Sequence, residues 1–100
     1  MWNLSQAIEL ARKINAVLYK DFYHVALGGS CLIKGQSTKD CDIFVYPHST
    51  QKQKDHDLLL GRLFVELGIK TIQLRKHEYD GKEVWHCELD SKRIDIFFVT

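Results

Sequence analysis

The spacing of apolar residues changes along the chain, and this change limits the folds that the sequence can adopt. From residue 4 to residue 19, apolar side chains recur every three or four positions without Gly or Pro, which predicts a helix. Residues 49–67 return to this spacing and are followed by Gly68, a common helix terminator. After residue 70 the apolar residues follow shorter periods, which are typical of strands. The chain therefore combines helices with a sheet.

The last third of the chain contains three short runs that predict antiparallel strands, TIQLRK, VWHCEL and RIDIFFV. Asp80-Gly81 is a hairpin signal between the first two, and Asp90-Ser91-Lys92 marks a tight turn between the last two. Two earlier runs, VALGG and DIFVY, predict further strands, with a short helix after the paired glycines. We expect an α+β fold in which a mixed sheet of about four to five strands carries helices on one face, with the N-terminal helix first.

The second predicted helix has an apolar stripe that should face the core. The stripe consists of Leu59, Leu60, Leu63, Phe64 and Leu67, with Arg62 and Glu66 on the polar side. Gly61 lies inside the segment and lowers its helix propensity, but the stripe is regular enough to predict a buried face.

Length and composition favour one folded domain that spans residues 1–100. Apolar residues make up 45% of the chain and charged residues 27%, which is ordinary for a globular protein. The net charge of +1 gives no general attraction to nucleic acid, so any polyanion must be recognised locally. No apolar run approaches the ~20 residues of a membrane span, and the start MWNLSQAIEL lacks the features of a secretion signal. We expect a cytoplasmic protein that does not contact membranes.

Cysteine and histidine residues lack metal-binding spacing. The three cysteines, Cys31, Cys41 and Cys87, are odd in number and form no CxxC motif, which argues against a disulfide framework and a zinc knuckle. The five histidines form no HxxxH or HExxH pattern, so we expect each to be structural or solvent-exposed. No zinc site is predicted.

Two aspartates at the start of a predicted strand suggest a cation site. Asp40 and Asp42 are separated by one residue, so their side chains lie on the same face of a strand. Like charges so close repel each other unless a cation or hydrogen-bond donors compensate. Carboxylate oxygens on one face are the ligands that Mg²⁺ requires. An ordinary polar loop with a capping aspartate is the alternative interpretation of STKDCD.

Asp95 is the natural third ligand of such a site. It lies in RIDIFFV, where Ile94, Ile96 and Phe98 share one face and Asp95 falls on the other. An acidic residue in the middle of an apolar strand is unusual, although a structural acid on an edge strand is an equally good explanation of Asp95 alone. If this strand pairs beside Asp42–Tyr46, the three carboxylates converge. If Asp95 faces the other side of the sheet, the catalytic interpretation fails.

Paired glycines precede the acidic segment and predict an anion-binding turn. Gly28 and Gly29 follow a strand and Ser30 opens a helix, so backbone amides and the positive end of the helix can approach a phosphate. Ser30 adds a hydroxyl donor, and Lys34 or Lys39 can neutralise phosphate charge. A nucleoside triphosphate fits such a turn. For the glycines alone, an ordinary tight turn is the alternative.

These motifs occur together in a recognisable order. The string GGS, a short helix ending at Gly35, the DxD pair ten residues beyond Ser30 and a late strand with a central aspartate resemble the nucleotidyltransferase superfamily. This superfamily includes DNA polymerase β, CCA-adding enzymes and minimal bacterial nucleotidyltransferases. The similarity extends over most of the chain and depends on the joint order of the motifs, since each one alone is weak.

The resemblance implies a role for each motif. Gly29 and Ser30 would hold the β- and γ-phosphates of a nucleoside triphosphate. Asp40 and Asp42 would ligate two Mg²⁺ ions, with Mn²⁺ as an alternative, and Asp95 would help to ligate the ion that activates the attacking hydroxyl. These three aspartates would be the catalytic residues, and a nucleoside monophosphate would pass to a protein, to a nucleic acid such as tRNA, or to a small molecule.

The sequence departs from the family pattern in two respects. The arginine that relatives often carry in the short helix is absent from SCLIKG, where Lys34 can substitute only as a point charge. The chain also ends soon after Asp95, without a helical domain to hold a base or a tRNA. The alternative hypothesis is therefore a catalytically weak or inactive nucleotide-binding or interaction module of the same fold, present as a homodimer or completed by a partner protein.

Overall fold

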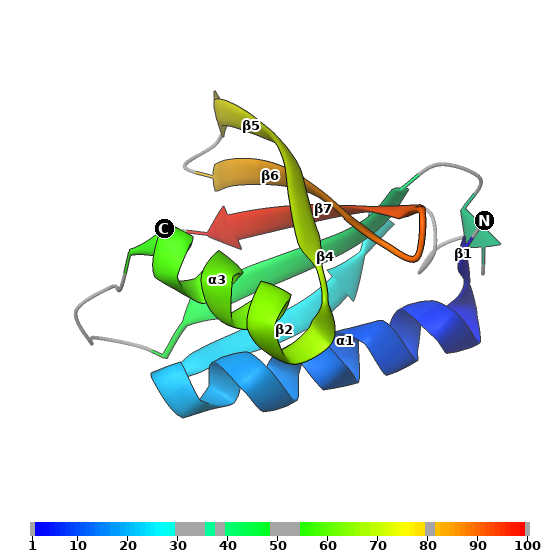
Figure 1. Cartoon of the computed structure of the whole chain (residues 1–100), viewed down its shortest axis with the longest axis horizontal. Coiled ribbons are helices and arrows are strands. Elements are labelled where there is room, and N and C mark those ends of the chain that lie inside the picture. The colour runs from blue at the N-terminus through cyan, green and yellow to red at the C-terminus, as the bar shows by residue number, and fades with distance from the viewer. Residues whose placement is uncertain (1, 30–35, 38–39, 49–54, 80–81, 100) are drawn as a thin grey trace.

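The computed structural model describes residues 2–29, 36–37, 40–48, 55–79 and 82–99 of the chain, with side chains throughout except at 36–37, 40, 73–79 and 82. Figure 1 shows the arrangement of its helices and strands. In chain order these are β1 (Trp2–Asn3), α1 (Leu4–Leu18), a short 3₁₀ helix (Tyr19–Asp21), β2 (Tyr23–Gly28), β3 (Gln36–Ser37), β4 (Asp40–Pro47), α3 (His56–Leu67), β5 (Lys70–Tyr79), β6 (Lys82–Leu89) and β7 (Lys92–Val99).

Five of the strands form a mixed sheet in the order β2-β4-β7-β6-β5. Strands β4 and β7 run parallel, and the other neighbours are antiparallel. The short strands β1 and β3 pair separately. The two described helices, α1 and α3, pack on the same face of the large sheet (Figure 1). This architecture confirms the expected α+β fold, and the N-terminal helix follows only a two-residue strand.

Helix α1 begins with a capping box, which explains why it starts where it does. The Gln6 backbone N–H donates to Asn3 Oδ1 (2.8 Å), and the Asn3 N–H donates to Gln6 Oε1 (3.1 Å). Just beyond α1, the buried Asp21 pairs with Arg62 of α3, with Nε and Oδ2 2.7 Å apart. The buried face of α1 consists of Ala7, Leu10, Ile14, Val17 and Leu18.

Helix α3 is shorter than the segment predicted for it. Asp55 caps its N-terminus, and residues 49–54 lie outside the described part of the chain. Gly68 has a φ of 75°, the left-handed conformation that ends a helix, so the predicted terminator is confirmed. Neither α1 nor α3 is long and apolar enough to cross a membrane. The residues buried by α3 are Leu59, Leu60 and Leu63.

The prediction that Phe64 belongs to the core is wrong. Phe64 is 54% exposed, and Leu67 is only half-buried. Strand β5 is the edge of the sheet, and Phe64 lies in a groove beside its first residues, Lys70 and Thr71. No described element lies beyond this edge to cover the ring. Helical spacing marks a face of a helix but does not reveal where the sheet under that face ends.

The β6–β7 hairpin has the turn that the sequence predicts. Asp90 and Ser91 both have positive φ, 51° and 66°, as a type I′ turn requires. Leu89 and Lys92 pair directly across this two-residue loop. The other predicted hairpin loop, Asp80-Gly81, lies outside the described residues.

The apolar face of the sheet determines which residues lie on its other face. On β4 the fully buried residues are Cys41, Ile43 and Val45, and on β7 they are Ile94, Ile96 and Phe98. Since successive side chains of a strand alternate between faces, Asp42 and Asp95 lie on the face opposite α1 and α3.

Candidate functional site

One row of paired residues crosses the sheet and contains the candidate site. Asp42 on β4 pairs with Gly28 on β2 and with Asp95 on β7. Asp95 in turn pairs with His86 on β6. Residues that pair across strands project from the same face, so the three side chains are neighbours on the face opposite the helices.

Asp42 and Asp95 fulfil one part of the geometry that the catalytic interpretation requires, and the third carboxylate, Asp40, lies outside the described side chains. Asp42 and Asp95 are direct partners of the parallel pair β4–β7, and Asp95 does not face the helices. Asp95 is only 9% exposed, and its carboxylate therefore lies in a medium that strengthens charge interactions. Two carboxylates in this position are stabilised by donors or cations close by.

His86 supplies one such donor, and sequence reasoning missed it. His86 Nδ1 lies 2.6 Å from Asp95 Oδ1, and both side chains are mostly buried. The signal was present in the sequence. Because Leu89 pairs with Lys92 across a two-residue loop, His86 and Asp95, each three residues farther from the loop, must pair as well. The expectation that every histidine is merely structural or exposed overlooked this register.

Neighbouring side chains lie so close to the backbone of Gly28 and Gly29 that neither position has room for a Cβ atom. Gly29 has a φ of 70°, and a Cβ at this position would overlap the carboxylate of Asp42. A Cβ at Gly28 would overlap the ring of Phe44. The backbone of the predicted phosphate-binding turn thus lies against one of the predicted metal ligands.

Several predicted site residues lie outside the described structure. Ser30, Lys34 and Lys39 are among them. The backbone of Asp40 is placed and pairs with Arg93 of β7, but the Asp40 side chain is not described. These roles therefore stay predictions.

The described donors suit a hard cation in their chemistry. Asp42 and Asp95 offer carboxylate oxygens, the ligand type that Mg²⁺ prefers. Within the described side chains, which exclude Asp40, no three His, Cys, Asp or Glu residues are grouped to hold a metal ion. Completion of a three-carboxylate set therefore depends on Asp40.

Cys87 lies beside the site but on the core side of β6. The pKa of this thiol is raised to about 11, mainly by burial; a hydrogen bond with Thr71 lowers the pKa, and the negative charge of Asp95 raises it. Both Cys87 and Cys41 are buried free thiols. At neutral pH Cys87 is therefore protonated and unreactive.

We expect the raised pKa of Cys87 to make stability depend on pH in the alkaline range. The unfolded chain loses this proton first, so the stabilisation by the neutral thiol is complete below pH 9 and is lost as pH rises towards about 11. The free energy of unfolding should fall by about 3 kcal/mol across this window. Urea denaturation at several pH values, compared with Cys87→Ala, isolates this contribution. An identical pH dependence in both proteins would contradict the assignment.

The sequence matches no protein-family model and shows no significant similarity to a curated protein. The functional argument therefore depends on the residues and geometry of the site.

Proposed function

We propose that this chain is a Mg²⁺-dependent nucleotidyltransferase, which moves a nucleoside monophosphate from a nucleoside triphosphate to a hydroxyl acceptor. The observation that carries the proposal is the position of Asp42 and Asp95, directly opposite each other on adjacent parallel strands. Carboxylates held so close favour a bound cation. The contact between Gly29 and Asp42 brings the proposed phosphate turn to the same point.

Each residue has a defined task in this proposal. Asp40, Asp42 and Asp95 would hold two Mg²⁺ ions, whose charge, when bound, stabilises the attacking and leaving oxygens of an in-line displacement. The backbone amides of Gly29 and Ser30 would bind the outer phosphates and orient the triphosphate. The protein thus acts mainly by positioning its substrate.

His86 is a positioning residue in this scheme. An ionised Asp95 can only accept a hydrogen bond, so as a metal ligand it would accept from Nδ1–H of His86, 2.6 Å away, and this bond would fix the orientation of the carboxylate. We expect His86→Ala to lower the apparent affinity for Mn²⁺ or Mg²⁺ by about 10–100-fold. The ion concentration that gives half-maximal nucleotide transfer measures this effect.

The matched variant for this test is His86→Asn, whose side-chain amide can donate to Asp95 from a similar position. It should recover most of the ion affinity that His86→Ala loses. Equal losses in both variants, together with equal losses of thermal stability, would show that His86 has only a structural role.

Isothermal titration with ATP and the other nucleoside triphosphates, with and without Mg²⁺, tests the proposal. We expect binding that requires Mg²⁺, followed by transfer of label from the triphosphate to protein, tRNA or small-molecule acceptors. Binding without transfer would favour the alternative, an inactive nucleotide-binding module. The absence of binding to every triphosphate, with or without Mg²⁺, would contradict both functions.

We also propose that the protein works in the cytoplasm. Cys41 and Cys87 are buried free thiols, as is usual in a reducing compartment. Fractionation of cells that produce the tagged chain tests this proposal, and recovery of the protein outside the cytoplasm would contradict it.

A further inference from the structure

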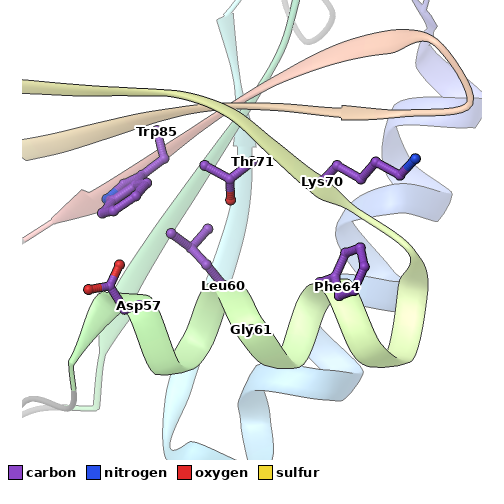
Figure 2. A pocket seen from close by; sticks show the side chains of 7 residues that line it. All are labelled: Asp57, Leu60, Gly61, Phe64, Lys70, Thr71 and Trp85. Atoms are coloured by element: carbon purple, nitrogen blue, oxygen red, sulfur yellow. The ribbon is translucent and has the colours of Figure 1, made fainter.

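A groove runs between helix α3 and the edge of the sheet, away from the row of Asp42 and Asp95. It has a volume of about 610 Å³. Figure 2 shows its lining, in which the side chains of α3 lie below those of β5 and β6. The lining residues are Asp57, Leu60, Gly61, Phe64, Lys70, Thr71 and Trp85.

The two ends of this groove carry opposite charges. Asp57 lies at the end near Trp85, and Lys70 lies at the other end, near Phe64 (Figure 2). Both charged side chains are exposed. The groove between them is largely apolar, with Leu60 at its floor. A groove with one negative and one positive end favours an occupant that places a positive charge at the Asp57 end and a negative charge at the Lys70 end.

Helix α3, which borders the groove, carries large apolar side chains that are exposed. Leu58, Phe64 and Val65 of α3 are 48%, 54% and 80% exposed. Contiguous exposed apolar surface of this kind marks a contact with another macromolecule. Gly61 lies in the middle of this surface, and a Cβ there would meet no atom of the described residues within 4 Å. The backbone of another molecule can therefore approach α3 closely at Gly61.

We propose that α3 and this groove form a two-fold symmetric interface between two copies of the chain. A two-fold axis near Gly61 reverses the direction of the groove in the second copy. Asp57 of each copy then faces Lys70 of the other, and the half-exposed ring of Phe64 reaches the groove of the other copy. Such an isologous contact uses the same surface on both molecules, so the negative end of the groove in one copy meets the positive end in the other. The inference does not depend on the proposed nucleotide chemistry.

Sedimentation equilibrium of the full chain over a range of concentrations tests this interface. We expect a reversible dimer, and we expect Gly61→Arg to raise its dissociation constant at least about 100-fold by blocking the close approach of the two helices. Because no atom of the described residues lies within 4 Å of a Cβ at Gly61, the variant should keep the circular dichroism spectrum of the wild type. A wild-type chain that stays monomeric at concentrations up to about 100 µM, at which even weak specific complexes form, would overturn the proposal.

Charge reversal tests the orientation of the two copies. Asp57→Lys and Lys70→Asp should each raise the dissociation constant of the dimer about tenfold, because each places like charges together at both ends of the interface. The double variant should return to within about threefold of the wild type, since it restores both pairs. Failure of the double variant to recover affinity would overturn the antiparallel arrangement.

The matched control is Glu66→Lys. It makes the same change of charge as Asp57→Lys on the same helix, but Glu66 is exposed and does not line the groove. Its dimer should be as stable as that of the wild type. An effect as large as that of Asp57→Lys would show that net charge, and not the groove, controls association.

Discussion

Replacing Asp42 with asparagine should lower nucleotide transfer about 10³-fold or more, which corresponds to a loss of about 4 kcal/mol of transition-state stabilisation. Asparagine keeps the shape of the side chain but removes the charge that a bound Mg²⁺ requires. Asp95→Asn should have a similar effect, since the two residues are direct partners across β4 and β7. Transfer of label from a nucleoside triphosphate measures both.

The melting temperatures of the same variants show whether a loss of activity comes from loss of the metal site or from loss of the fold. Asparagine keeps the size and the hydrogen-bonding oxygen of the Asp42 side chain, so without Mg²⁺ the melting temperature of Asp42→Asn should stay close to that of the wild type. With Mg²⁺ and ATP, the wild type should gain stability through binding and the variant should not.

Asp90→Asn is a suitable control because it makes the same chemical change outside the site. Asp90 lies in the β6–β7 turn with a φ of 51°, a conformation that asparagine tolerates well. Its activity should match that of the wild type. If Asp42→Asn keeps more than about a tenth of wild-type activity, the two-metal proposal is wrong, because loss of a metal ligand costs far more.

The parts of the fold that local sequence signals determine were predicted well. The β6–β7 turn needs two residues with positive φ, and Asp90-Ser91 supplies them. Gly68 ends α3 because glycine adopts the left-handed conformation at little cost. These features depend on a few neighbouring residues, so the sequence contains the information.

Features that depend on distant parts of the chain were harder to predict. The exposure of Phe64 follows from the position of β5 at the sheet edge, which no helical pattern reveals. The parallel pairing of β4 with β7 was expected only as a condition for the carboxylates to meet, because strand order is a property of the whole sheet.

Only part of the candidate site could be predicted for the same reason. The alternation of side chains was enough to place Asp95 on the polar face of its strand. The partner of Asp95, His86, required the register of the β6–β7 hairpin as well. No pattern in the sequence identifies the acceptor, because recognition of a hydroxyl group needs few residues and no fixed spacing.

Two glycine substitutions should have opposite effects on stability. At Gly29, alanine would have to adopt a φ of 70°, and its Cβ would overlap the Asp42 carboxylate. The left-handed conformation alone costs alanine about 1–2 kcal/mol, and the overlap must displace either the turn or the carboxylate. At Gly61, in the middle of α3, the Cβ of alanine meets nothing within 4 Å in the described part of the chain, and alanine should stabilise the helix by about 0.5–1 kcal/mol.

Thermal denaturation of dilute protein, in which dimers do not contribute, measures both effects. In a domain of this size each kcal/mol should shift the melting temperature by about 4–8 °C, downward for Gly29→Ala and upward for Gly61→Ala. Nucleotide transfer should be largely lost in Gly29→Ala, because the phosphate turn and Asp42 can no longer keep their contact, and it should be unchanged in Gly61→Ala. If Gly29→Ala melts and transfers nucleotide like the wild type, the Gly29 turn does not position Asp42, and the proposed site loses its phosphate-binding half.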